Sequence, residues 1–355
     1  MRIIVTGGAG FIGSALVRYL IQDTPHETLV IDKLTYAGTL ASLHRVQGHP
    51  RFHFSQTDIA AADRINKLFA TFDPDAVIHL AAESHIDRSI AAPDEFVTTN
   101  VIGTYVLLEA ALAHWRKLRG ARAEAFRFLH VSTDEVYGSL PDGVLFTEMT
   151  PYNPHSPYSA TKAASDHLVR AWGHTYGLPI IVTNCSNNYG PYQFPEKLIA
   201  LAITRALRNE PIPLYGEGLN VRDWLFVDDH VKALVRVLKQ GRLGETYNIG
   251  GDSQRRNVDV VLAICDALDR VEPRSQGGSY RELMRYVADR PGHDFRYAID
   301  FSKIRDELDW MPTVPFEAGL AATIDWYIQN RAWWEPLLDS AKTPGGGLQL
   351  PGRVA

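Results

Sequence analysis

Two short segments of the sequence hold the side chains best able to do chemistry. In the first, Thr133, Asp134 and Glu135 place a hydroxyl and two adjacent carboxyl groups at the end of an apolar run. In the second, Tyr158 and Lys162 stand four residues apart, so on a helix their side chains share one face. A nearby ammonium favours the phenolate, which can accept the proton of a substrate alcohol while hydride leaves. Thr133 can hydrogen-bond the same alcohol, and the two carboxyl groups supply an acid and a base for a second step.

Each segment also has an ordinary interpretation. Tyr158 and Lys162 by themselves form a spacing that is common on helices, and Asp134 with Glu135 would also suit a solvated turn or the start of a helix. Two close carboxyl groups, however, resist joint ionisation and hold one proton between them, as an acid–base pair requires. Oxidation of an alcohol needs only the tyrosine and the lysine. A chain with both segments is therefore predicted to do more than move a hydride.

A glycine-rich turn near the start of the chain predicts a dinucleotide site. Gly7, Gly10 and Gly13 follow a short apolar run and lead into a helical pattern. Glycine lets the backbone turn tightly and approach a pyrophosphate, and the helix N-terminus offers N–H donors. Asp32 ends the next apolar run, where a carboxylate binds both ribose hydroxyls and repels a 2′-phosphate. The sequence therefore favours NAD over NADP, although the neighbouring Lys33 weakens the preference.

The ends of further strands are expected to meet at the same crevice. Asp58 and Ile59 follow a third strand and are predicted near the adenine, although Asp58 would equally serve as the N-cap of the next helix. Ala81, Ala82 and Ser84 follow a fourth strand, where small side chains leave room for a flat cofactor. The predicted cofactor site comprises Gly7, Gly10, Phe11, Ile12, Gly13, Asp32, Lys33, Leu34, Thr35, Asp58, Ile59, Leu80, Ala81, Ala82, Ser84, Thr99, Tyr158, Lys162 and Asn188.

The first half of the chain alternates apolar runs with helical patterns. Continuous apolar strands that alternate with helices are typical of a parallel sheet covered on both faces. We therefore predict an α/β fold with a Rossmann-type doubly wound sheet. Strands are expected at 2–6, 28–32, 51–54, 76–80, 126–132 and 179–183, with long helices at about 93–116 and 157–176.

After Cys185 the pattern changes, and a smaller, mixed C-terminal substrate domain is expected. The segment 187–193 is predicted to be a loop, followed by helices at about 196–209 and 257–269 and by a strand that enters a turn at 247–251. The predicted organisation is an NAD-binding domain at 1–190, to which about 224–250 returns, a substrate domain mainly at 191–330, and a flexible tail at 340–355.

Length, charge and cysteine content narrow the class of protein. The 355 residues, 45% of them hydrophobic, are enough to bury a sizeable core. With 36 Lys and Arg against 41 Asp and Glu, and with no basic run, nucleic acid is not an expected partner. Only Cys185 and Cys265 are present, which suits a reducing cytoplasm. The N-terminus enters a strand without signal-peptide features, and no apolar stretch approaches the roughly 20 residues that cross a bilayer. A cytoplasmic protein with no metal and no membrane partner is therefore expected.

Several longer motifs extend beyond the two chemical segments: Thr133-Asp134-Glu135, Asp87-Arg88-Ser89 after His85, and the segments 187–199, 220–224 and 289–294. Together with the glycine turn and the tyrosine–lysine pair, they resemble the extended short-chain dehydrogenase/reductase family over nearly the whole chain, up to about residue 330. Within that family the chain is similar to the dTDP-glucose 4,6-dehydratases. Two departures concern Ala200, where a proline is usual, and Phe295, in a commonly more polar stretch; neither touches an expected catalytic group.

The resemblance implies the conversion of dTDP-glucose into a 4-keto-6-deoxy sugar nucleotide. Tyr158 would deprotonate the sugar 4-hydroxyl while C4 gives hydride to NAD. The new ketone acidifies the C5 proton, which Glu135 would remove, and Asp134 would protonate the departing 6-hydroxyl. Hydride would then return to C6 while Glu135 reprotonates C5, so that NAD is regenerated in each cycle and stays bound.

A nucleotide sugar also needs cations for its diphosphate and a slot for its base. Lys197, Arg222 and Arg290 are candidates for the charge, because an arginine can hold a phosphate through two parallel hydrogen bonds. Tyr215 can stack on a pyrimidine or belong to the core. With the residues that the resemblance adds, the predicted substrate site comprises Ser84, Thr133, Asn187, Glu196, Lys197, Pro213, Leu214, Tyr215, Arg222, Asn257, Arg290 and His293.

Two other functions are compatible with parts of this pattern. A nucleotide-sugar 4-epimerase or decarboxylase would share Tyr158 and Lys162 but would have no use for a C5 base beside an acid for the 6-hydroxyl. A protein that binds NAD without turnover need not retain either set. Thymine and uracil differ by one methyl, worth only about 1–3 kcal/mol in a hydrophobic contact, so the base stays open. The pathway served, rhamnose or a secondary metabolite, stays open as well.

The two long helices carry more apolar residues than one sheet needs. Family members usually pair these helices, so a homodimer is expected, although the sequence does not separate an interface from the core. The apolar residues concerned are Val97, Val101, Leu108, Leu112, Leu168 and Trp172.

Overall fold

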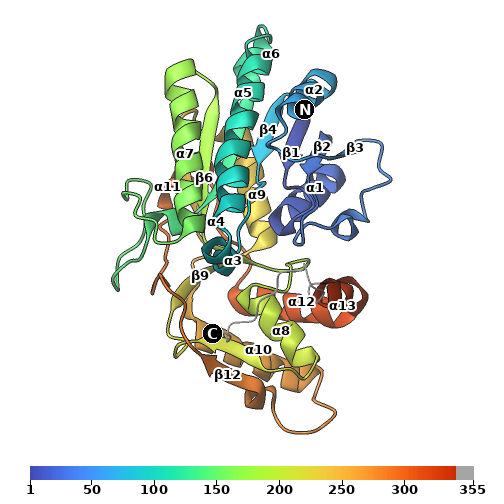
Figure 1. Cartoon of the computed structure of the whole chain (residues 1–355), viewed down its shortest axis with the longest axis vertical. Coiled ribbons are helices and arrows are strands. Elements are labelled where there is room, and N and C mark those ends of the chain that lie inside the picture. Colours follow the sequence, from blue (N-terminus) through green and yellow to red (C-terminus); the bar gives the residue numbers. More distant parts are fainter. Residues whose placement is uncertain (341–355) are drawn as a thin grey trace.

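A seven-stranded parallel sheet organises the larger part of the protein (Figure 1). The computed structural model describes residues 1–340, so the predicted tail lies outside the described residues apart from Ser340, which ends the last helix. The strand order is β10-β6-β5-β4-β1-β2-β3, and all neighbours are parallel. These strands are β1 (Arg2–Thr6), β2 (Glu27–Asp32), β3 (Phe52–Gln56), β4 (Ala76–His79), β5 (Arg127–Thr133), β6 (Ile180–Cys185) and β10 (Thr246–Ile249).

Successive side chains of the central strands point to opposite faces of the sheet, and both faces are apolar. On one face Ile3 and Val5 belong to a core built with α1 (Phe11–Asp23), α9 (Val227–Gln240) and α11 (Ser302–Leu308). On the other face Ile4 belongs to a core built with α2 (Ala62–Phe72), α5 (Thr104–Trp115) and α7 (Pro157–Tyr176). Helices therefore cover both faces, and the predicted doubly wound Rossmann-type sheet is confirmed.

The long helix expected at 93–116 is interrupted. It consists of α4 (Pro93–Phe96), a π-helical segment η2 (Val97–Gly103) and α5. π-Helical turns often occur where a helix meets a functional site, and Thr99 of η2 receives a 2.9 Å hydrogen bond from Lys33 Nζ, beside the glycine turn. The helix at 157–176 is confirmed as α7.

The stretch Pro93–Trp115 corrects the expectation that no apolar stretch is long enough to cross a bilayer. Its 23 residues, with a mean hydropathy of 1.4, are long and apolar enough to span a bilayer by length and composition alone. However, 61% of its apolar window is buried inside the protein, where α5 packs against α2 and α7. Leu108 and Leu112 are buried in this core, whereas Val97 is exposed, and Leu168 and Trp172 are partly buried against the core. Of the apolar residues named for an interface, Leu108 and Leu112 are therefore core residues.

A second core lies below the large sheet in the view of Figure 1. The segment 187–193, expected as a loop, contains the short strand β7, which lies parallel to β9 because Asn187 to Tyr189 pair with Trp224 to Phe226. The boundary at residue 190 stays a prediction. The elements of this part are β7 (Asn187–Tyr189), α8 (Leu198–Leu207), β8 (Ile212–Tyr215), β9 (Val221–Phe226), β11 (Gln254–Arg256), α10 (Asn257–Val271), β12 (Met284–Val287), α12 (Phe316–Gln329) and α13 (Arg331–Ser340).

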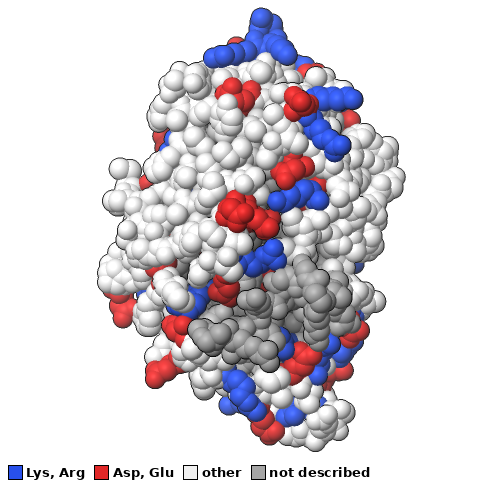
Figure 2. Space-filling model, in the orientation of Figure 1, with Lys and Arg blue, Asp and Glu red and all other residues white. Residues whose placement is uncertain are grey.

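Charged side chains of both signs are interspersed on the face of the molecule that Figure 2 shows. Blue and red side chains lie next to one another over the upper part of this face. Ion pairs also join charged side chains of the larger part, as Arg122 does with Asp73 and Asp75. That nucleic acid is not a partner stays a prediction.

Candidate active site

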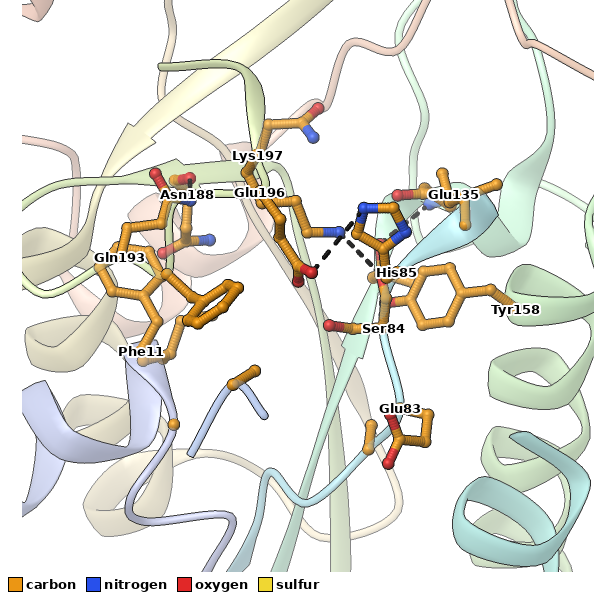
Figure 3. Close-up of a pocket in the computed structure, with 18 of the residues that line it drawn as sticks. Phe11, Glu83, Ser84, His85, Glu135, Tyr158, Asn188, Gln193, Glu196 and Lys197 are labelled. Atoms are coloured by element: carbon orange, nitrogen blue, oxygen red, sulfur yellow. Dashed lines mark hydrogen bonds and ion pairs between the residues drawn. The ribbon is translucent and has the colours of Figure 1, made fainter. Parts of the chain in front are cut away.

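A cavity of about 440 Å³ lies at the carboxyl ends of β1, β4, β5 and β6. Ligands of open parallel sheets bind outside the carboxyl ends of the strands, so this is where the fold predicts a site. Thr133 and Cys185 end β5 and β6 and line the cavity, and Tyr215 and Asn257 line it from the smaller part. Figure 3 shows Glu135 and Tyr158 on one side and Asn188, Gln193 and Phe11 on the other.

The glycine turn leaves one wall of the cavity as bare backbone. Gly7 has φ +69°, and a Cβ on Gly13 would lie 2.1 Å from the Gly7 carbonyl oxygen, so this turn requires glycine. Asp32 shapes the turn from β2, because its carboxylate accepts hydrogen bonds from the backbone N–H of Ala9 (2.9 Å) and of Leu34 (2.8 Å). An open turn at the N-terminus of α1 beside a carboxylate fits the pyrophosphate and ribose of a dinucleotide.

All but two of the residues predicted to bind the cofactor line the cavity. The exceptions are Leu34 and Asp58. Leu34 has φ +58°, and its backbone N–H donates a hydrogen bond to the Asp32 carboxylate, so it helps to position Asp32. Asp58 accepts a 2.8 Å hydrogen bond from the backbone N–H of Ala60 and lies 3.9 Å from Lys33 Nζ. It therefore stabilises the turn that leads into α2, close to its alternative interpretation as a cap. The binding roles of the others stay predictions.

Thr133, Asp134 and Glu135 are buried at the end of β5, where a 3-10 turn, η3 (Asp134–Tyr137), begins. The Thr133 hydroxyl donates to Asp134 Oδ1 at 3.3 Å and accepts from the Glu135 N–H at 3.3 Å. Burial raises the pKa of both carboxyl groups, and the neighbouring Glu135 raises the pKa of Asp134 further. Asp134 Oδ2 has no hydrogen-bond partner among the described residues. A buried pair with raised pKa values argues against a solvated turn.

Tyr158 and Lys162 lie in the first turns of α7. Ser156 and Ser159 form a capping box and Pro157 occupies the first helical position, so the sequence begins the helix just before the tyrosine. Lys162 Nζ donates a 2.9 Å hydrogen bond to the Val131 carbonyl oxygen rather than to the phenol. Burial and the charge of Glu135 raise the pKa of Tyr158. The expected lowering of this pKa by the lysine is thus not found in this arrangement.

All the predicted substrate residues line the same cavity. Two non-covalent contacts join the loop after β4 to the segment before α8 (Figure 3). Lys197 Nζ donates a 2.7 Å hydrogen bond to the Ser84 carbonyl oxygen, and His85 Nε2 lies 3.8 Å from Glu196 Oε2. Burial raises the pKa of Glu196 to about 7. The two parts of the molecule therefore meet across the cavity through charged and polar groups.

Cations and an aromatic ring gather at the far end of the cavity. Arg222 is buried, with its guanidinium 4.3 Å from the centre of the Tyr297 ring. Arg290 lies 3.8 Å from the carboxylate of Asp87, and the Tyr215 hydroxyl donates to the same carboxylate at 2.8 Å. Tyr215 is therefore a wall of the cavity and not a core residue. Its ring lies 5.9 Å from the Arg290 guanidinium, and an aromatic ring with a cation beside it suits a base with a diphosphate.

Some lining residues were not predicted. His85 and Asp87 lie inside a motif of the resemblance, and Glu83 lies in the segment that follows β4, so the motif and the strand end were the signals that pointed to them. Gln193 also lines the cavity and lies inside the segment 187–199, another motif of the resemblance. Tyr297 follows no strand end or glycine turn, and the sequence offered no signal for it.

The raised pKa of Asp134 predicts how stability depends on pH. A carboxyl whose pKa is higher in the folded state binds protons more tightly there, so the free energy of unfolding falls as pH rises from its unfolded pKa of about 4. Asp134→Asn removes this cost. We expect urea unfolding to show the variant more stable than the wild type by on the order of 1 kcal/mol at pH 7, with the gain vanishing toward pH 4. A gain that is equal at both pH values would contradict the assignment.

Comparison of the whole sequence supports one family. The family model described as GDP-mannose 4,6 dehydratase matches residues 4–323. A dTDP-glucose 4,6-dehydratase of Neisseria meningitidis serogroup B is 55% identical over 343 residues, which are 96% of this chain and 97% of the relative. The dTDP-glucose 4,6-dehydratase 1 of Escherichia coli K12 is 56% identical over 342 residues, which are 94% of each.

Solved structures are similar over the same length. The dTDP-glucose 4,6-dehydratase DesIV of Streptomyces venezuelae, with NAD and TYD bound, has a TM-score of 0.86 at 46% identity and covers 95% of this chain and 100% of its own. A UDP-glucose 4-epimerase of Thermotoga maritima, with UDP-glucose, has a TM-score of 0.82 at 28% identity, with coverage of 93% and 100%. Fold alone does not separate these two activities, whereas sequence identity does. The chain belongs to the GDP-mannose 4,6 dehydratase family of NAD-linked sugar-nucleotide enzymes, among relatives that are dTDP-glucose 4,6-dehydratases.

Proposed function

We propose that this chain is an NAD-dependent dTDP-glucose 4,6-dehydratase that forms dTDP-4-keto-6-deoxyglucose. The observation that carries this function is the buried pair Asp134 and Glu135, which faces the same cavity as Tyr158 and Lys162. The glycine turn and Asp32 form the opposite end of that cavity. Relatives that are more than half identical over nearly the whole chain carry the same activity in their names.

The chain's own groups move the protons of the reaction. A bound NAD supplies a hydride acceptor in the oxidation of C4 and a hydride donor in the reduction of C6. Tyr158 takes the proton of the 4-hydroxyl, which Thr133 orients. Glu135 then takes the C5 proton that the ketone has acidified, and Asp134 protonates the 6-hydroxyl as it leaves as water. When hydride is added at C6, Glu135 returns a proton to C5. Burial suits both roles, because a raised pKa keeps Asp134 protonated as an acid and makes Glu135 a stronger base.

The alternative activities explain less of the site. An epimerase oxidises and reduces the same carbon and needs no acid for a 6-hydroxyl, so it offers no role for a second buried carboxyl. A protein that only senses NAD offers no role for either carboxyl. Burying Asp134 and Glu135 together costs free energy, and such a cost is common at sites that use the shifted groups in chemistry.

The location and assembly of the enzyme are further proposals. Cys185 and Cys265 are free thiols, which fits the cytoplasm. A homodimer through the two long helices is supported by an apolar face that includes Val97, Ile102 and Tyr105, each more than 40% exposed. Tyr105 packs edge-on against Trp172 of α7 at 5.9 Å, so this face continues from α5 onto α7.

The function is tested by incubation with dTDP-glucose, UDP-glucose and GDP-mannose, followed by mass spectrometry of the products. We expect loss of one water from dTDP-glucose, a preference of about tenfold or more over UDP-glucose, and no net release of NADH. An isomer of unchanged mass would indicate an epimerase instead, and accumulation of free NADH would contradict a redox cycle that closes on the enzyme.

A second test isolates Glu135. Glu135→Gln keeps the shape of the side chain but removes the base for the C5 proton. Reduction of the bound nicotinamide after mixing with dTDP-glucose should persist, while formation of the keto product should fall by about 10²–10⁴. Absorbance of the reduced nicotinamide and product analysis measure the two steps separately. Wild-type product formation by this variant would assign the base elsewhere.

A third test concerns assembly. Val97→Asp with Ile102→Asp places charges on the proposed interface, whereas Val271→Asp changes an exposed valine at the end of α10 as a matched control. Size-exclusion chromatography with light scattering should show twice the chain mass for the wild type and the control, and the single chain mass for the double variant. A wild type of single chain mass would contradict the dimer.

A further inference from the structure

The face of α7 that carries the proposed catalytic pair continues beyond the cavity. Tyr158, Lys162, Asp166 and Arg170 follow one another at intervals of four residues, so their side chains form one stripe along the helix. The first two line the cavity, whereas Asp166 does not. Asp166 is nevertheless fully buried, and it is unused in the mechanism above.

The carboxylate of Asp166 is held by donors from three segments: β5, the stretch that contains Tyr152, and β6, whose Asn184 amide donates at 3.5 Å. It accepts hydrogen bonds from His130 Nε2 at 3.0 Å and from the Ser132 hydroxyl at 2.8 Å, both on β5. It also accepts one from the Tyr152 hydroxyl at 2.8 Å. Tyr152 in turn accepts a 2.7 Å hydrogen bond from Arg170. Burial alone would raise the pKa of Asp166, but the hydrogen bonds from His130 and Ser132 and the charge of Lys162 bring it below its ordinary value.

Lys162 depends on a counter-charge because it is buried as well. Burial lowers the pKa of its ammonium, and the largest opposing contribution comes from the charge of Asp166, one helical turn along α7. The other titratable groups facing Lys162 are His79 on β4, His130 on β5 and Cys185 on β6. Burial lowers the pKa of His130 to about 4, lowers the pKa of His79 well below its ordinary value and raises the pKa of the Cys185 thiol to about 12, so all three are uncharged at neutral pH.

We propose that Asp166 is a positioning residue that holds Lys162 as a charged ammonium beside Tyr158, and that the donors on β5 and Tyr152 exist to keep this carboxylate ionised. Among the described residues that face Lys162, Asp166 is the one anion, and it sits one helical turn from the lysine. It acts through Lys162 and does not touch the substrate. The strand that carries Thr133, Asp134 and Glu135 is thereby joined to the helix that carries Tyr158, because Ser132 binds the same carboxylate.

This inference rests on the proposed function and is tested in the Glu135→Gln background, where only the first oxidation is observed. The rate of nicotinamide reduction with dTDP-glucose is measured by stopped flow across pH for the Glu135→Gln parent and for Glu135→Gln/Asp166→Asn. Removal of the anion lets the lysine lose its proton at lower pH. We expect the alkaline limb of the profile to move down by about one pH unit or more and the rate at neutral pH to fall about tenfold. The dTDP-glucose concentration at half-maximal rate should change less than twofold, because Asp166 does not line the cavity.

Asp229→Asn in the same background is the matched control. Asp229 is also a buried carboxylate held by several donors, the Thr313 N–H and hydroxyl and the Val314 N–H, but it lies outside the cavity and faces no catalytic group. Its loss should lower the melting temperature without moving the alkaline limb. An unmoved limb in the Asp166→Asn variant overturns the inference, whereas a parent that never reduces the nicotinamide contradicts the proposed function itself.

If the Asp166→Asn variant does not fold, a second variant still tests the role of Asp166. If Asp166→Asn fails because it leaves a buried ammonium uncompensated, Lys162→Met/Asp166→Asn should fold, since the second change removes that ammonium. Circular dichroism and thermal unfolding measure this rescue. A double variant that is equally unfolded would mean that Asp166 serves only its hydrogen bonds to His130, Ser132 and Tyr152, and it would overturn the role assigned here.

Discussion

The constraint on which this structure depends is the burial of ionisable groups around one cavity. Asp134, Glu135, Lys162, Asp166 and Arg222 are all withdrawn from water. A charge in such a place is costly unless it is paired or hydrogen-bonded, or unless it changes its protonation state. The chain uses both solutions. Asp166 keeps its charge through several side-chain donors, whereas Asp134 has one oxygen without a partner among the described residues and a raised pKa. The first solution suits a fixed counter-ion and the second suits an acid that must release a proton.

The fold positions these buried side chains by placing them on separate helices and strands. β5 ends at Thr133, and its parallel neighbours β4 and β6 end at the same edge of the sheet. α7 packs against β5, β6 and η3, so Tyr158 in its capped first turn lines the same cavity as the carboxyl pair but comes from a different element. The π-helical turn η2 brings Thr99 into contact with Lys33 near the glycine turn. Each side chain is therefore held by regular structure, as a site requires when its groups must meet one substrate with little freedom.

Much of the larger part followed from the sequence. The apolar runs that became β1, β2, β4, β5 and β6 are buried on both faces, and such continuous patterns are the strongest local signal that a chain offers. The helix expected at about 157–176 is α7, and the structure shows that a capping box of Ser156 and Ser159 begins it. The smaller part was predicted less well. β7 was expected as a loop, because a three-residue strand has no periodicity of its own and forms only when β9, more than thirty positions later in the chain, pairs with it. The place of Tyr297 in the site likewise depends on contacts between distant parts of the chain, which local sequence patterns do not reveal.

The sequence by itself determined which chemistry was available: a phenol with a lysine one turn later, two adjacent carboxyl groups, a glycine turn and an acid at the end of the next strand. Residue type and local spacing are covalent properties, so they need no fold to be known. Only the tertiary structure decided which side chains share a cavity, that Asp58 and Leu34 lie outside it, and that Asp166 stands behind Lys162. Burial and hydrogen bonding arise from elements far apart in the chain, and these set the charge of each group.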